Sequence, residues 1–486
     1  DAINGRTWRL EQSSAEAMLL VDRIEATFSG VLTEPEGSGG SLQGAVELVT
    51  ARHALEPGTD ETRQHWRLDL NSESLPLSVA SLLRRRVRAL TPYVPRTIHG
   101  DATGGVRVQA FTDGSIEASI DDLRVRNLTA ADKGTRVWSN GLATISGDLV
   151  LRGERVIGQD LRAATDFASA TIDGAFSRTF SLVGANDNPL CWLNAIDGTA
   201  TAELDLAAFD RSLPGVLPLR DDAMILSGRL RATVDSIPAG ESRSSQLSVQ
   251  TDTIRARSRG AEVAVDPVVL TAQVSSSNGQ LRADKFEWNS SFGSAIGHGD
   301  LRSGVADFRI DFGRLTALLR PILQISEATL AGTANGNVEW SASDDATWRL
   351  AGMTDAKDLL ITFPGGRSLS RPSIHGEIDA VGRWGGQSLD VLSRAKVSLV
   401  SSGVDLDATL MRPVNSPGKG TPLPFRFKGK GRMETLAETL GPWIPSQFAG
   451  LTGGFDIDAT AEVQRDEFQL TYASPCSGCS LRMPSS

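Results

Sequence analysis

The segment Phe455-Asp-Ile-Asp-Ala-Thr-Ala-Glu-Val463 decides the fold class, because apolar and polar residues alternate along its whole length. Successive side chains of a β-strand point to opposite faces of a sheet, so one face of this strand is apolar and the other is polar. Such alternation is typical of half-buried antiparallel sheets rather than of parallel sheets covered on both sides. It recurs in Trp66-Arg-Leu-Asp-Leu70 and in Ala202-Glu-Leu-Asp-Leu206. The sequence therefore predicts a mainly β, mostly antiparallel protein.

The chain repeats one pattern four times: an alternating strand, a short Leu-rich helix that ends at a proline, a glycine turn and a second alternating strand. In the third copy, the strand Phe308-Arg-Ile-Asp-Phe312 precedes a predicted helix at 315–319, which Pro321 ends. The other predicted helices cover 79–87, 209–213 and 436–440. Their apolar residues form one stripe, so each helix is amphipathic. The glycine turns are predicted at Gly100, Gly228 and Gly332.

These copies divide the chain into five predicted units. They are a partial N-terminal unit at 1–64, three repeat units at 65–200, 201–305 and 306–424, and a partial C-terminal unit at 425–486. Three strands of small residues, at 167–174, 292–299 and 400–407, each precede a new strand–helix start. A continuous stack of units is the organisation that this pattern favours.

Composition excludes several classes of protein. The 486 residues include 49 Lys and Arg against 59 Asp and Glu, a net charge of −10. A nucleic-acid-binding surface needs a basic stripe, so we expect no nucleic-acid partner. Hydrophobic residues make up 40% of the chain, which is enough to exclude a disordered protein.

Motifs for catalysis or metal binding are weak. Ser393-Arg-Ala-Lys396 matches a serine-nucleophile signature, but its usual companion segments are absent and Lys396 is expected to face solvent. Cys476-Ser-Gly-Cys479 has no second cysteine pair or nearby histidine for zinc, so it is either a local disulfide or two incidental thiols. We therefore predict no enzyme activity, no cofactor and no metal site.

The repeated motifs resemble the AsmA-like superfamily, which includes TamB-type proteins of the bacterial envelope. The cues are Asp69-Leu70 before Leu82-Leu83-Arg84, Asp311-Phe312 before Leu315, and the starts Leu226-Ser-Gly228 and Leu330-Ala-Gly332. The resemblance implies an elongated, curved sheet that forms an apolar, β-taco-like trough, with one short helix per repeat. It also implies a periplasmic protein, anchored in the inner membrane by a segment outside this chain.

The function that this resemblance implies is the transport of phospholipids or other acyl lipids between the inner and outer membranes, for outer-membrane biogenesis. Envelope proteins are expected as further partners. An apolar trough would shelter acyl chains from water, at about 0.8 kcal/mol per buried methylene. The residues predicted to line it are Leu68, Leu70, Val106, Val108, Leu204, Leu206, Leu230, Val234, Ile310, Val338, Trp340, Phe455, Ile457, Ala459 and Val463.

Two other functions are compatible with a β-rich chain. The first is an envelope or secretion-assembly module that binds protein clients by adding a strand to its sheet. The second is a hydrolase on a β-helix scaffold, which the lack of a convergent acid–base set makes weaker. Tryptophans such as Trp66 and Trp348 either contact an apolar ligand or pack in the core.

Overall fold

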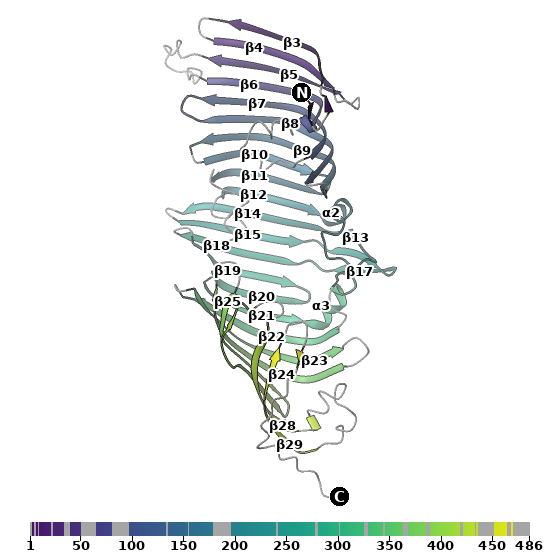
Figure 1. Cartoon of the computed structure of the whole chain (residues 1–486), viewed down its shortest axis with the longest axis vertical. Coiled ribbons are helices and arrows are strands. Elements are labelled where there is room, and N and C mark those ends of the chain that lie inside the picture. Colours follow the sequence, from purple (N-terminus) through teal and green to yellow (C-terminus); the bar gives the residue numbers. More distant parts are fainter. Residues whose placement is uncertain are drawn as a thin grey trace. The chain divides into compact units, whose positions relative to one another are not determined.

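The fold is seen in a computed structural model of the chain (Figure 1). It is mainly β and antiparallel, which confirms the predicted class. The structure describes residues 2–3, 6–7, 9–20, 23–33, 39–49, 65–79, 97–132, 135–153, 155–177, 196–239, 242–277, 280–300, 302–324, 329–343, 346–362, 368–384, 389–417, 421–432, 434–435, 452–463 and 468–469.

The chain forms two compact units. Unit 1 comprises Asp1–Ala185, Leu190–Leu217 and Ile225–Val249, and unit 2 comprises Asn186–Pro189, Pro218–Met224 and Gln250–Ser486. Strands β13 (Ala223–Ser227) and β15 (Ser242–Thr251) contain residues of both units. The boundaries of the five repeat units stay a prediction, and each compact unit is described separately below.

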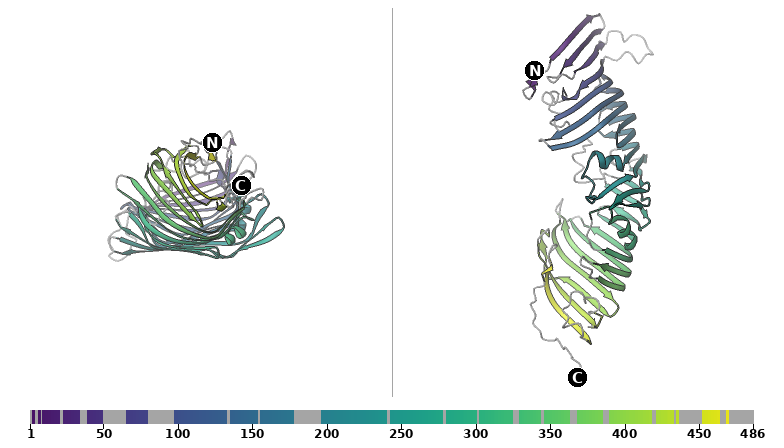
Figure 2. Two further views of the ribbon diagram at one scale, coloured as in Figure 1. Left: turned by 90° about the horizontal axis from the view of Figure 1, so that it is seen from below. Right: turned by 90° about the vertical axis from the view of Figure 1, so that its right-hand side faces the viewer.

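Unit 1 is an antiparallel sheet in which each long strand pairs with the next one along the chain (Figure 2). A separate pair, β1 (Ala2–Ile3) and β2 (Arg6–Thr7), precedes it. The long strands are β3 (Arg9–Leu19), β4 (Arg23–Thr33), β5 (Gly39–Val49), β6 (His65–Pro76), β7 (Thr97–Phe111), β8 (Ile116–Asp132), β9 (Thr135–Arg152), β10 (Arg155–Thr165), β11 (Ala168–Ser177), β12 (Ile196–Asp205) and β14 (Arg229–Ala239).

Unit 2 has the same neighbour-to-neighbour order, except that the short β27 pairs with β25 and β26 pairs with β28. A short hairpin, β16 (Ile254–Ser258) with β17 (Ala261–Val265), comes first. The strands that follow are β18 (Val269–Ser277), β19 (Gln280–Ser290), β20 (Gly293–Asp300), β21 (Ser303–Asp311), β22 (Thr329–Ala342), β23 (Thr347–Thr362), β24 (Ser368–Trp384), β25 (Leu389–Ser401), β26 (Val404–Leu410), β27 (Val414–Asn415), β28 (Leu423–Arg432), β29 (Gly454–Val463) and β30 (Phe468–Gln469). Among the described strands of this unit, no pairing joins β18 to β29 or β30, so the sheet is open.

Two short helices begin in the same way. The carboxylate of Asp205 accepts the N–H of Ala208 at the start of α2 (Leu206–Ser212), and that of Asp311 accepts the N–H of Arg314 at the start of α3 (Phe312–Leu319), each over 2.9 Å. An aspartate in this N-cap position stabilises a helix because it satisfies an unpaired backbone donor. The two residues that the alternation placed at strand ends, Leu206 and Phe312, therefore begin helices instead.

The predicted helices at 209–213 and 315–319 correspond to α2 and α3. The one at 79–87 begins at the last residue of a 3₁₀ turn, η3 (Leu77–Val79), and continues outside the described residues. The fourth, at 436–440, also lies outside them, although 434–435 form a helical turn just before it. That every repeat contains one helix therefore stays a prediction.

An even number of strands separates the helical segments within each unit. Six described strands, β7 to β12, separate η3 from α2 in unit 1. In unit 2, six long strands (β22 to β26, and β28) separate α3 from the helical turn at 434–435. Each hairpin reverses the chain, so an even number of strands returns it to the same end. Within each unit, the helical segments therefore lie at one end of the strands.

The predicted glycine turns are wrong at two of three positions. Gly100 and Gly332 lie inside β7 and β22, where the pairing register shifts. Gly332 has φ +103° opposite Asp358 at φ +51°, and a Cβ there would lie 2.6 Å from backbone oxygens of β23. Glycine is needed at this bulge because a side chain fits neither the φ angle nor the space. Gly228 does lie in a connection, between β13 and β14.

Candidate functional site on the apolar sheet faces

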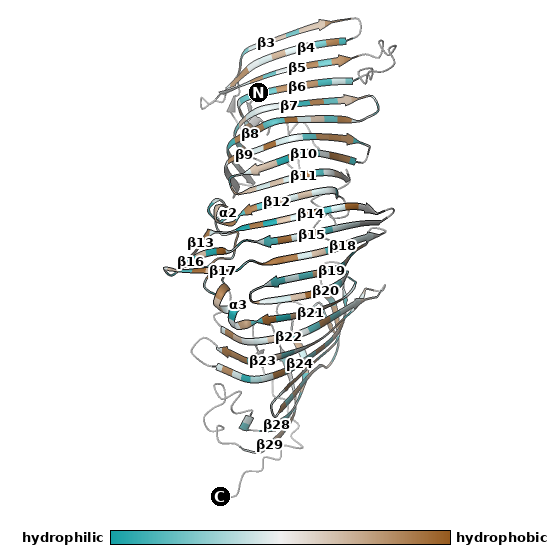
Figure 3. Ribbon diagram, turned by 180° about the vertical axis from the view of Figure 1, so that it is seen from behind, coloured by the Kyte–Doolittle hydropathy of each residue, from teal (hydrophilic) through white to brown (hydrophobic). Residues whose placement is uncertain are grey.

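In unit 2, the strand register collects apolar residues on one side of the sheet, called here its apolar face. Trp288 pairs with Leu270 on one side and Ala295 on the other, and Ala295 pairs with Phe308. Directly paired residues share a face, so these side chains form one row across neighbouring strands. Parallel rows contain Val338, paired with Ala306 and Gly352, and continue to β29. Apolar and polar segments alternate along the strands in Figure 3.

Unit 1 has an apolar face of its own, built in the same way. Leu68 pairs with Val108 and with Val46, and Leu70 pairs with Val106. The row continues from Val108 to Ala118 and Leu149 in the next two strands. The alternation that the sequence shows in single strands is thus kept in register from strand to strand.

The register places most of the predicted lining residues on these apolar faces. Leu206 is the exception, because it begins α2. Val463 pairs with Leu423, but its side chain lies outside the described part of the structure. The remaining predicted lining residues all lie on the apolar faces. They are Leu68, Leu70, Val106, Val108, Leu204, Leu230 and Val234 in unit 1, and Ile310, Val338, Trp340, Phe455, Ile457 and Ala459 in unit 2. Their role in binding stays a prediction.

Aromatic rings lie over glycines on the neighbouring strand. A Cβ added to Gly336 would be 2.7 Å from Cζ of Phe308, and one added to Gly304 would be 2.2 Å from Cζ2 of Trp340. Phe286 covers Gly297 in the same manner. Because glycine has no side chain, the ring can occupy the space over it. The ring then lies flat along the sheet and adds apolar area to the face.

Large apolar side chains remain uncovered on both faces. In unit 1, Ile24, Val46, Leu48 and Trp66 are 36–42% exposed, on three successive strands. In unit 2, Ile378, Leu399, Leu406 and Ile457 are 37–42% exposed. Contiguous exposed apolar patches on a folded protein mark sites that bind other molecules.

Sequence reasoning missed Ile378, Leu399 and Leu406 as lining residues. The signal was present, because Val397, Leu399 and Leu406, Ala408 alternate with polar residues as the predicted positions do. The segment 400–407 was instead interpreted as a strand of small residues that precedes a new repeat, and not as part of the lining. Register and curvature, which the sequence does not give, decide which alternating positions stay uncovered.

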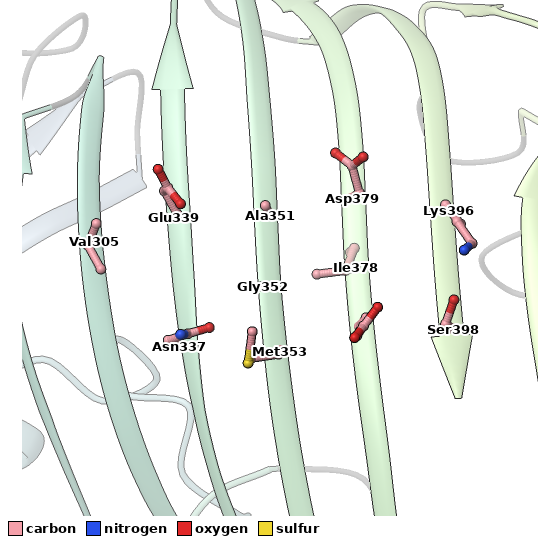
Figure 4. Close-up of a pocket in the computed structure, with 11 residues that line it drawn as sticks. Val305, Asn337, Glu339, Ala351, Gly352, Met353, Ile378, Asp379, Lys396 and Ser398 are labelled. Carbon is pink, nitrogen blue, oxygen red and sulfur yellow. The ribbon is translucent and has the colours of Figure 1, made fainter. Parts of the chain in front are cut away.

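The opposite face of unit 2 is polar, and several of its charges form ion pairs. Asp379 accepts hydrogen bonds from Arg349 (3.2 Å) and Arg394 (2.8 Å). A cavity of about 320 Å³ on this face is lined by residues including Asn337, Glu339, Asp379 and Lys396 (Figure 4). Nζ of Lys396 lies 3.9 Å from the carboxylate of Asp407, which places the Ser-x-x-Lys lysine in a solvent-exposed ion pair. Such pairs stabilise a solvated sheet face and need no catalytic role.

The polar face of unit 1 contains a similar ion cluster. Asp69 accepts a hydrogen bond from Arg107 (2.7 Å) and forms an ion pair with Arg67 (2.8 Å). Burial by itself raises the pKa of Asp69, but the hydrogen bonds from the two arginines outweigh it and hold the pKa below its ordinary value. Asp69 therefore links β6 to β7 through its hydrogen bond with Arg107.

Neither metal ligands nor a membrane helix are found in the described part of the chain. No group of three or more His, Cys, Asp or Glu residues there could hold a metal ion. No helix there is long and apolar enough to cross a bilayer. Cys476 and Cys479 lie beyond the described residues.

The chain matches no family model, no curated protein and no solved structure. The resemblance to AsmA-like proteins therefore remains a prediction from the sequence motifs alone.

Proposed function

We propose that the protein is a non-enzymatic lipid carrier whose apolar sheet faces bind the acyl chains of phospholipids. The observation that carries the proposal is the continuity of the apolar rows from strand to strand together with their exposure. In unit 2, Leu399 and Leu406 pair directly on neighbouring strands, and each is more than a third exposed. Leaving such a row in water is unfavourable, and covering it with hydrocarbon recovers about 25 cal/mol per Å².

The cellular role follows from the resemblance of the motifs. An AsmA-like protein would act in the periplasm and carry lipids between the inner and outer membranes. The polar face, with ion pairs such as Arg426–Asp458 (2.6 Å), would then stay in water while the apolar face holds lipid. No catalytic group takes part in this function.

A transfer assay tests the proposal. Purified protein is mixed with donor vesicles that contain a fluorescent phospholipid and with unlabelled acceptor vesicles, and the rate of transfer is measured. Wild type should raise the rate above the rate of vesicles alone, and Ile457→Asp should lower it several-fold, because a carboxylate on the apolar face repels an acyl chain. Met353→Asp is the control, since Met353 is 48% exposed against 38% for Ile457 but pairs with Asn337 and Glu377 on the polar face. Equal effects of the two variants would refute acyl-chain binding by the apolar face.

Strand β3 favours a second candidate function, the binding of protein clients by strand addition. All of its residues are exposed, and Leu10 and Leu19 are 63% and 78% exposed. It pairs with β4, and no described strand pairs with its other edge. An unpaired edge presents free N–H and C=O groups to an extended peptide.

A synthetic peptide with the β4 sequence, Arg23-Ile-Glu-Ala-Thr-Phe-Ser-Gly-Val-Leu-Thr33, is a suitable probe because it already matches one edge of β3. Strand addition predicts saturable binding by fluorescence anisotropy and its loss in the double variant Ala17→Lys and Leu19→Lys. If wild type does not bind the peptide, this second function has no support.

A further inference from the structure

The apolar face of unit 2 is closed over at one end of strands β24 to β28. Ala380, Leu392 and Leu410, on three successive strands, are only 6–9% exposed. Trp348 from β23 and Phe425 from β28 pack against them from the two sides. Val414 in β27 belongs to the same buried cluster, and Leu389 and Leu423 also pack against it. The sheet is strongly curved in this region (Figure 2).

The other end of the same strands is bridged by a buried arginine. Arg371 in β24 is 7% exposed and donates from Nη2 to the carbonyl oxygen of Thr435 over 2.9 Å. Thr435 belongs to the helical turn after β28, whereas β25 and β26 separate β24 from β28 in the sheet. A Cβ on Gly403, in the turn between β25 and β26, would lie 3.2 Å from the Thr435 hydroxyl. The helical turn therefore folds back over the β25–β26 turn.

Between these two ends, Leu399, Leu406 and Ile457 form an uncovered row, and Ile378 lies beside it, paired with Val397 in the next row. These four residues are each 37–42% exposed. Leu399 and Leu406 pair directly, and Leu406 and Ile457 both pair with Gly429. The row thus crosses the strands from β24 to β29, along the direction in which the strands stack. Apolar surface is left open in the middle of a face that is closed at both ends.

The chemistry of this row specifies its occupant. On the same face, Gly376, Ala408 and Phe427 carry neither charge nor side-chain hydrogen-bonding groups. The hydroxyl groups of Thr354 and Ser401 on this face already donate to the carbonyl oxygens of Asn335 and Ser373. The backbone groups of β25 and β26 are paired in ladders with their neighbouring strands. An extended peptide laid along the row would bury N–H and C=O groups without partners, at a cost of about 1–3 kcal/mol each. A hydrocarbon chain has no such groups.

We infer that the uncovered row is a subsite that holds a single acyl chain between the two closed ends of this face, and that it retains the chain longer than the exposed apolar residues of unit 1 do. This subsite rests on the proposed lipid-binding function and adds to it a place where lipid is retained. An acyl chain in the subsite must pass the Arg371 bridge at one end or the packed Trp348 and Phe425 at the other, so its release is slow. A chain on an open face dissociates without any rearrangement.

Photocrosslinking at matched positions tests the subsite. Leu399 in unit 2 and Leu48 in unit 1 are the same residue type with nearly equal exposure, 37% and 36%. Each is replaced separately by p-benzoylphenylalanine, and the protein is loaded from phosphatidylethanolamine–phosphatidylglycerol vesicles that contain a phospholipid with an alkyne-tagged acyl chain. After removal of the vesicles, the sample is diluted and irradiated at increasing times, and the tagged protein is quantified.

As the delay between dilution and irradiation grows, the yield of lipid adduct at position 399 should fall about ten-fold more slowly than the yield at position 48. Equal persistence at the two positions, or an adduct at position 48 alone, would overturn the subsite and leave the proposed function standing. The absence of an adduct at both positions would instead count against the proposed function itself.

Removing the bridge gives a second test. Arg371→Ala deletes the bond to Thr435, so the adduct yield at position 399 should fall several-fold faster with the delay before irradiation, while the decline at position 48 stays the same. Circular dichroism checks that the variant keeps its β content. Unchanged loss at position 399 in a folded Arg371→Ala variant would contradict enclosure by this bridge.

Discussion

At the scale of single residues, the apolar faces depend on glycines that make room for aromatic rings. Gly304 in β21 has no room for a side chain, because a Cβ there would lie 2.2 Å from Cζ2 of Trp340 and 2.7 Å from the carbonyl oxygen of His298. The Trp340 ring is itself held by a hydrogen bond from Nε1 to the carbonyl oxygen of Asp300 (2.8 Å). The ring therefore cannot move away without losing that bond.

Gly304→Ala should destabilise the protein by about 1–3 kcal/mol, the usual cost of forcing extra volume into a packed site. Urea unfolding followed by tryptophan fluorescence measures the change. Gly454→Ala is the control, because its nearest contact would be a backbone oxygen at 3.8 Å, and it should stay within about 0.5 kcal/mol of wild type. A second substitution, Trp340→Leu, should recover part of the loss, and no recovery would show that the ring is not the cause.

His375 on the polar face couples stability to pH. Its Nδ1 lies 2.8 Å from the carboxylate of Asp355 and its Nε2 lies 3.4 Å from that of Glu377. The hydrogen bond to Asp355, followed by that to Glu377, raises the pKa of His375 above its ordinary value of 6.5. The charged imidazole is thus favoured in the folded state, so its contribution is complete below the unfolded pKa and is lost as the pH rises through the folded pKa.

Wild type should therefore exceed His375→Gln in urea midpoint at pH 5.5, and the difference should shrink towards pH 8.5. Asp355→Asn removes the principal partner and should reduce the same pH dependence. A difference between wild type and His375→Gln that is constant over this range would contradict the ion-pair role.

At the scale of elements, the positions of two helices were predictable, but their first residues and the strand irregularities were not. Leucine spacing and a following proline indicated helices near 209–213 and 315–319 because both signals are local. The bulges at Gly100 and Gly332 were read as turns, since a glycine with positive φ occurs in both. Only the partner strand, with Asn127 or Asp358 opposite, distinguishes a bulge from a turn.

The cap of α3 provides a test at this scale. Asp311→Ala should lower stability by about 1 kcal/mol, because the N–H of Arg314 loses its acceptor. Asp311→Asn keeps an acceptor oxygen and should stay close to wild type, which thermal unfolding by circular dichroism can measure. If Asn and Ala are equally destabilising, the charge of Asp311, which lies 3.8 Å from Nε of Arg314, and not the cap, is the important feature.

At the scale of the whole molecule, alternation in the sequence predicted a sheet with one apolar and one polar side. The register within each unit agrees, as Leu68–Val108 and Val338–Gly352 illustrate. The sequence could not show which apolar positions are uncovered. Leu410 is 8% exposed and Leu406 is 42% exposed, although they lie on the same face of one strand. Leu410 belongs to a buried cluster with residues of β24, β25 and β27, which lie apart in the sequence, and Leu406 does not.

The central claim is that the apolar face, and not the polar face, holds lipid. Native mass spectrometry of protein purified without detergent tests it most directly, with Leu406→Asp compared with Val400→Asp. The two side chains are 42% and 45% exposed, and they lie on opposite faces of neighbouring strands. The account predicts phospholipid adducts on wild type and Val400→Asp and a several-fold loss of adducts on Leu406→Asp. Lipid-free wild-type protein, or equal adducts on both variants, would contradict it.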